Sequence, residues 1–105
     1  IMSVCYGSLI KKNNFDDILN IYKNFYANSP FIRVMSKNNN ASLTDVRGSN
    51  YCNLVVDIDE RTNRLRIISY IDNLMKGQAG NAMQVLNKLF NFDETLGLDI
   101  TSQYP

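Results

Sequence analysis

The sequence contains no histidine and no tryptophan among its 105 residues. Histidine is the side chain that most often moves a proton in catalysis near neutral pH, so this chain brings no imidazole acid or base of its own. Two cysteines are too few for a disulfide framework. Cys5 and Cys52 both lie in apolar runs, which predicts buried free thiols in a reducing, cytoplasmic compartment.

Long apolar runs and an excess of one charge are also missing. No run approaches the roughly 20 residues that span a bilayer, and no basic region leads into a longer apolar one as in a signal peptide. The net charge is +1, so the composition gives no reason to expect nucleic acid or a membrane as a partner. What is present, 45% hydrophobic and 20% charged residues, is ordinary for one globular domain.

Apolar periodicity predicts an α+β domain with an antiparallel or mixed sheet and helices packed on one face. We expect a buried strand over residues 1–7, strands over 31–36, 51–59 and 64–71, an extended segment over 43–50, and helices over 15–26 and 78–90. Asn13 or Asn14 is expected to cap the first helix. The pair of strands around Glu60 is a predicted hairpin.

Residues 72–90 are the stretch around which the rest of the chain is organised. A polar turn follows a strand, and the second helix then opens with Gly77 and Gly80, each of which costs a helix about 1 kcal/mol relative to alanine. Glycines in such a place indicate a close approach to the backbone. A ligand at the helix start is one explanation, whereas tight packing within the fold is the one that the spacing alone favours.

Three pieces of the chain, in this order and spacing, carry a resemblance. They are Arg47-Gly48-Ser49-Asn50 within residues 46–52, the long Asp-Asn-Leu-Met-Lys-Gly-Gln-Ala-Gly motif that begins at Asp72, and Asp93-Glu94-Thr95 within residues 93–98. Together they resemble the C-terminal part of N-acetyl-γ-glutamyl-phosphate reductase. The resemblance covers nearly the whole chain and is strongest over residues 30–97.

The resemblance implies an NADP-dependent reductase of arginine biosynthesis, acting on N-acetylglutamyl phosphate and its semialdehyde, and a partial glyceraldehyde-phosphate-dehydrogenase-like C-terminal domain. Residues 1–76 would belong to a catalytic and dimerisation domain of a homo-oligomer. Residues 77–105 would form a C-terminal helix and tail, ending at Pro105, that pack on an N-terminal dinucleotide-binding domain absent from this chain. The family's Gly-Cys nucleophile motif, its histidine and its dinucleotide fingerprint are also absent, so the chain alone should be inactive.

The resemblance also implies site residues. Asn73, Leu74 and Gly77 would bind the cofactor, with the Asn73 amide near the nicotinamide; the alternative is that Asn73 caps its own turn. Ser49 and Asn50 would face substrate; the alternative is a bulged strand with a polar edge. No residue of this chain is predicted to be catalytic or to bind a metal. Arg47 is a candidate for binding a carboxylate or phosphate.

Two rival interpretations stay open. Aspartate-semialdehyde dehydrogenases share a similar Asp-Asn-Leu-x-x-Gly piece, although not the other two pieces in this arrangement. Alternatively, the chain is a non-catalytic assembly or dimerisation fragment. In either case a separated piece would expose apolar surface, in particular parts of residues 1–6 and the stripe formed by Ala79, Met83 and Leu86.

Overall fold

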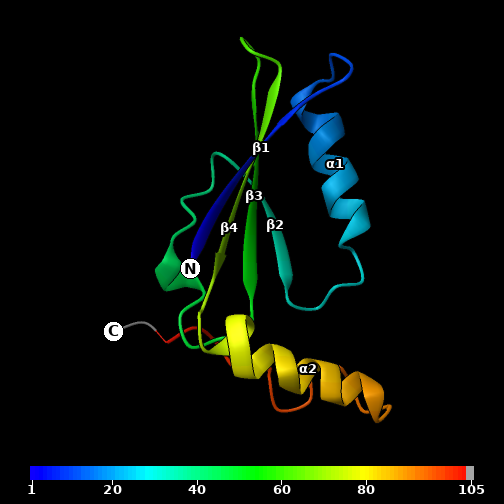
Figure 1. Ribbon diagram of the computed structural model, residues 1–105, viewed down its shortest axis with the longest axis vertical. Helices are drawn as coiled ribbons and strands as arrows, with labels where there is room; N and C mark the ends of the chain where they lie inside the picture. The colour runs from blue at the N-terminus through cyan, green and yellow to red at the C-terminus, as the bar shows by residue number, and fades with distance from the viewer. Residues whose placement is uncertain (104–105) are drawn as a thin grey trace.

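The structure, a computed structural model, describes residues 1–103, so the predicted chain end at Pro105 lies outside the described residues. The elements in chain order are β1 (Met2–Ser8), α1 (Phe15–Phe25), β2 (Ile32–Ser36), a 3-10 turn (Leu43–Asp45), β3 (Cys52–Asp59), β4 (Arg64–Ile71), a π-helical turn (Met75–Ala79) and α2 (Gly80–Leu89) (Figure 1). The predicted strands and helices are confirmed to within a few residues at their ends.

The four strands form one mixed sheet in the order β1-β4-β3-β2. β4 pairs antiparallel with both β1 and β3, whereas β2 pairs parallel with β3. The β3–β4 hairpin places Asp57 opposite Arg66 and turns at Asn63, whose φ of +51° is one that asparagine tolerates better than most residues. The expected α+β class with a mixed sheet is confirmed.

Helix α1 covers one face of the sheet over β2 and β3. It begins where predicted, because the Asn14 Oδ1 accepts a hydrogen bond from the Asp17 backbone amide at 2.8 Å. Ile18 and Leu19 are buried against Val56 in the main hydrophobic core. Burying such an aliphatic side chain contributes about 1.5–3 kcal/mol each, so this contact is what holds α1 on the sheet.

Strand β1 is not buried, contrary to the prediction from its apolar sequence, whereas the exposure expected for parts of residues 1–6 in a separated piece is confirmed. All seven of its residues are exposed, including Val4 and the thiol-bearing Cys5. The physical reason is its place in the sheet: β1 is an edge strand, and α1 packs over the two strands farthest from it. The apolar residues therefore predicted the strand correctly. They could not show whether another element of this chain covers it.

The segment over residues 43–50 is not extended, which corrects a second prediction. Leu43–Asp45 forms a 3-10 turn with a capping box, in which the Asp45 carboxylate accepts from the Ser42 backbone amide at 2.7 Å. Further turns lead to β3, with Gly48 at a φ of +69°. Local side-chain-to-backbone bonds thus replace the ladder bonds of a strand.

Helix α2 lies across one end of the sheet rather than on the face that α1 covers (Figure 1). An amphipathic helix normally buries its apolar side. In α2 the buried residues are instead Gly80 and Asn87. The apolar side chains of Met83, Leu86 and Leu89 are 48%, 45% and 73% exposed. The predicted exposure of the stripe formed by Ala79, Met83 and Leu86 is confirmed, and Leu89 extends this stripe. Within residues 1–103, no helix is both long and apolar enough to cross a membrane.

Replacing Phe31 by alanine is expected to destabilise the chain by about 3–5 kcal/mol, because this ring is 1% exposed and its loss leaves a cavity. Phe25→Ala is the matched control: its ring is 78% exposed and its loss should cost little. Guanidinium unfolding followed by circular dichroism, at one fixed protein concentration, measures both. Equal losses for the two variants would contradict this description of the core.

Candidate functional site

The turn after β4 is capped by Asp72. One carboxylate oxygen accepts hydrogen bonds from the backbone amides of Leu74 and Met75, both at 2.8 Å. The other oxygen accepts from the Gly48 amide at 2.9 Å. These donors, the Gly48 amide first and the Met75 amide next, lower the pKa of Asp72 below its ordinary value. Asp72 therefore provides the hydrogen-bond acceptor for the amides at the start of the helical segment. This segment begins at Met75, earlier than predicted.

Asn73 does not serve as a cap, since Asp72 already makes those contacts. Its side chain is exposed. Asn73 lines a surface cavity of about 300 Å³ together with Arg47 and Thr44. The structure thus brings together two candidates that are 26 positions apart in sequence, an amide and a guanidinium, at one end of the sheet.

Leu74 and Gly77 flank this turn. Leu74 is 62% exposed, as are several other large apolar residues of this chain. Gly77 is exposed, and its amide donates to the Asp72 carbonyl at 2.9 Å. A Cβ on Gly77 would lie 3.2 Å from that carbonyl oxygen, so its own turn already accounts in part for a glycine there.

Gly80 is explained by contact within the chain. It is buried, and a Cβ on it would lie 2.5 Å from the Asn50 Oδ1 and 2.8 Å from the Met75 carbonyl. No side chain other than hydrogen fits between α2 and the loop before β3. Of the two explanations left open for this glycine, tight packing is the one that the contacts support.

Ser49 and Asn50 are both fully buried. The Ser49 hydroxyl donates to the Val46 carbonyl at 2.8 Å, and the Asn50 amide donates to the Gln84 Oε1 at 3.1 Å. These bonds hold the loop together and fix it to α2. A contact of either side chain with substrate stays a prediction, and their burial favours a supporting role.

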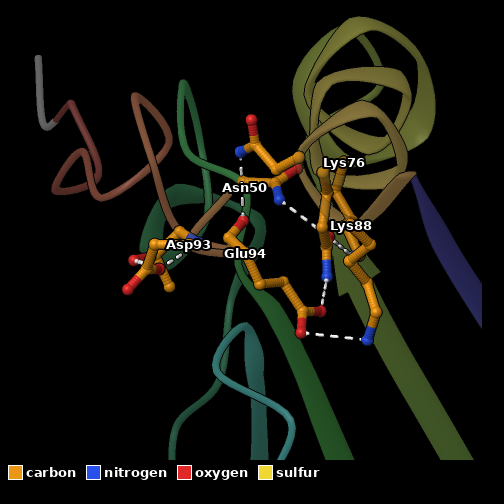
Figure 2. Close-up of polar contacts among 8 residues, drawn as sticks. Asn50, Lys76, Lys88, Asp93 and Glu94 are labelled. Carbon is orange, nitrogen blue, oxygen red and sulfur yellow. Dashed lines mark hydrogen bonds and ion pairs between the residues drawn. The ribbon is translucent and has the colours of Figure 1, made fainter. Parts of the chain in front are cut away.

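A polar network that sequence reasoning missed joins α2 to the chain that follows it (Figure 2). Gln84 donates to the Glu94 carboxylate at 2.6 Å and accepts from Lys76 at 2.6 Å, while Lys88 donates to Glu94 at 3.1 Å. Hydrogen bonds from Gln84 and then Lys88 lower the pKa of Glu94.

Asn87, which is 4% exposed, makes a second contact between α2 and the following chain: its amide donates to the Leu96 carbonyl at 3.0 Å. The only signal in the sequence was the four-residue spacing of Gln84 and Lys88 on one helix face.

Lys76 takes part in this network rather than standing free in solvent. Burial lowers the pKa of its ammonium, while Cys52 and Glu94 act in the opposite direction. Burial likewise raises the pKa of the Cys52 thiol, against a smaller opposing effect of Lys76. A thiol whose pKa is raised is a poor nucleophile at neutral pH. The prediction of burial is therefore confirmed for Cys52 and wrong for Cys5.

Comparison with known proteins identifies the family. Residues 1–73 match the family model described as the semialdehyde dehydrogenase, dimerisation domain. The chain belongs to this family. Over all 105 residues it is 45% identical to the N-acetyl-γ-glutamyl-phosphate reductase of Bacillus subtilis (strain 168), 39% to that of Geobacter metallireducens and 41% to that of Thermoanaerobacter sp. (strain X514). It spans about 30% of the length of each of these relatives.

The family assignment agrees with the architecture. A semialdehyde dehydrogenase dimerisation domain is consistent with the mixed sheet and α1, and the match ends at Asn73, within the turn before α2. The resemblance inferred from three short motifs is confirmed by relatives that align along the whole chain. The boundary predicted at residues 76 and 77 stays a prediction.

Gly80→Ala is expected to destabilise the chain by about 1–3 kcal/mol, because the added methyl group overlaps Asn50 and the Met75 backbone. Gly7→Ala is the control: that glycine lies in edge strand β1 and has nothing within 4 Å of its Cβ position. Thermal unfolding of both variants provides the measurement. An unchanged melting temperature for Gly80→Ala would show that α2 does not pack this closely on the loop.

Proposed function

We propose that this chain is the C-terminal part of the catalytic domain of an NADP-dependent N-acetyl-γ-glutamyl-phosphate reductase of arginine biosynthesis, with a cytoplasmic location. The observation that carries the proposal is identity of 39–45% across the whole chain with relatives of that name. The chain spans 30% of those relatives, so the activity belongs to a longer polypeptide and not to this segment alone.

The described residues support the proposal that the catalytic groups lie outside this chain. Reduction of an acyl phosphate to an aldehyde through a thioester needs a reactive thiolate and a group that handles a proton. The chain has no histidine, and burial raises the pKa of the Cys52 thiol. Cys5 lies on the exposed edge strand β1 and follows Val4, not the glycine of the family's nucleophile motif. Nucleophile and proton carrier are therefore expected from the remainder of the enzyme.

The contribution proposed for this chain is to hold the nicotinamide end of NADP. An asparagine amide both donates and accepts, so Asn73 can pair with a carboxamide and fix which face of the ring meets the acyl group. Its exposure, and the capping of its turn by Asp72, leave that amide available. Exposed Leu74 offers an apolar neighbour for the ring, and Gly77 is exposed in the same turn.

The same cavity is also proposed to contact the substrate, N-acetylglutamyl phosphate or its semialdehyde. Arg47 supplies a guanidinium beside Asn73, a group suited to a carboxylate or phosphate. Ser49 and Asn50 are proposed to act on substrate through the loop that carries Arg47, since both side chains bond inside the chain.

Two partners follow from surfaces that this chain leaves uncovered. Residues 1–73 match a dimerisation domain, which supports a homo-oligomer. The apolar stripe on α2, together with Phe90 at 64% exposure, supports docking of the dinucleotide-binding domain, because burying such side chains is the main driving force for domain contact. The competing possibility, a non-catalytic assembly fragment, shares these surfaces but assigns no role to Asn73.

Asn73→Ala in the full-length enzyme is expected to raise the KM for NADPH about tenfold, the cost of roughly two amide hydrogen bonds, without loss of folding. The assay is reduction of N-acetylglutamyl phosphate, or the reverse phosphate-dependent oxidation of the semialdehyde with NADP. Asn81→Ala, which removes an exposed amide from α2, is the control. An unchanged KM for Asn73→Ala would refute its cofactor role, and absence of reductase activity in the wild-type enzyme would leave the assembly fragment as the better explanation.

The isolated 105-residue chain is expected to lack reductase activity and to self-associate through its uncovered apolar side chains. Sedimentation velocity at several concentrations measures the association. Replacement of Met83 and Leu89 by glutamine should reduce it, whereas a substitution at solvated Lys12 should not. A monodisperse monomer that melts cooperatively at every concentration would contradict this prediction.

A further inference from the structure

Asp72 connects two segments that are far apart in the sequence. Its carboxylate accepts from the Gly48 amide, 24 residues earlier, as well as from the two amides of its own turn. Hydrogen bonds from backbone amides to an ionised carboxylate are stronger than neutral ones. One side chain therefore fixes both the loop that carries Arg47 and the turn that carries Asn73.

Gly48 is held in place from a second direction. Its φ of +69° lies in the left-handed region, and a Cβ on it would lie 3.3 Å from the side chain of Gln103. The Arg47 carbonyl accepts from the Gln103 amide at 2.9 Å. Few residues other than glycine adopt the Gly48 conformation. The bond from the Gly48 amide to Asp72 therefore starts from a backbone position that the sequence specifies.

We propose that Asp72 is a positioning residue for dinucleotide binding: it holds the Asn73 amide at the orientation that meets the nicotinamide, and it keeps Asn73 beside Arg47 in one cavity. This inference rests on the cofactor role proposed for Asn73. It goes beyond that role because it assigns the orientation to Asp72, which also lines this cavity and whose carboxylate oxygens accept from backbone amides. A displacement of about 1 Å in such a group lowers catalytic efficiency by up to about a hundredfold.

A cap that only stabilises the fold predicts something different. Loss of a helix cap typically lowers stability by about 1 kcal/mol, and such a loss affects every variant of the enzyme alike. A positioning residue acts through one other side chain, so its effect on binding disappears when that side chain is removed. The two roles are therefore separated by a double-mutant cycle between Asp72 and Asn73.

The experiment uses the full-length enzyme with four proteins: wild type, Asp72→Asn, Asn73→Ala and the double variant. The KM for NADPH and kcat are measured for each by reduction of the acyl phosphate, and the Kd for NADPH is measured without substrate by fluorescence titration. Asp72→Asn keeps the size of the side chain but removes one acceptor. It is expected to raise the KM for NADPH about tenfold when Asn73 is present and less than about twofold when Asn73 is alanine.

Asp93→Asn is the matched control, because Asp93 also accepts from backbone and hydroxyl donors of its own turn, at Thr95, but lies on the exposed C-terminal loop. It should leave the KM for NADPH unchanged. If Asp72→Asn does not fold, Asp72→Ser replaces it in the cycle: serine is a good cap for its own turn, but its shorter side chain loses the carboxylate that reaches Gly48.

The outcomes distinguish the two proposals. A rise in KM that is equal in both Asn73 backgrounds, or no rise at all, overturns the positioning role while leaving the cofactor role of Asn73 intact. An Asn73→Ala variant with an unchanged KM overturns the cofactor role, and the positioning role falls with it. A rise that depends on the presence of Asn73 supports both.

Discussion

The interaction on which the rest of this structure depends is the set of three backbone amides held by the Asp72 carboxylate. A strand that ends and a helix that begins within three residues leave backbone amides without ladder or helical partners. Asp72 satisfies two of these directly and uses its second oxygen to bind the loop before β3. The same bonds stabilise the ionised form, which lowers the pKa of Asp72. Because one side chain does this, the sheet end, the loop and the start of the second helical segment form one unit, and Asn73 is left free at its surface.

Helix α2 is attached to the rest of the chain mainly through polar contacts. A ten-residue helix is marginal by itself and normally gains its stability by burying an apolar face. Here the buried side is made of Gly80 and Asn87, and polar contacts through Gln84 and Glu94 hold the following chain against it. The close approach at Gly80 allows Asn50 to reach Gln84. Since amide and carboxylate groups on one side attach the helix, the apolar stripe on the other side is not needed for attachment within this chain.

The sequence allowed some of this to be predicted and not the rest, for physical reasons. Periodicity located the strands, and the cap at Asn14 was found because it depends on neighbours within three residues. The burial of β1 was predicted wrongly, because burial depends on which strand becomes the edge, a long-range property. The segment over 43–50 was misassigned as extended, since its capping box competes with strand pairing through one local bond. At the site, the motif that begins at Asp72 was recognised, but a carboxylate that bonds across 24 residues leaves no periodic signal. The Gln84–Glu94 network was missed because the two residues are ten positions apart, beyond the spacing of one helix face.

Asn73 and the uncovered stripe of α2 belong to one continuous stretch of backbone, and under the proposed function this continuity would link assembly to cofactor binding. The turn that presents Asn73 leads directly into the helical segment that presents Met83 and Leu86. A body that buries the stripe would therefore lie at the same end of the sheet as the exposed amide, next to the turn that Asp72 caps. If that body is the dinucleotide-binding domain, the apolar contact would supply affinity between the domains, and the Asn73 amide would orient the nicotinamide ring. Under that proposal the hydrophobic contribution would come from the helix and the specific hydrogen bond from the turn, so a substitution could alter one without removing the other.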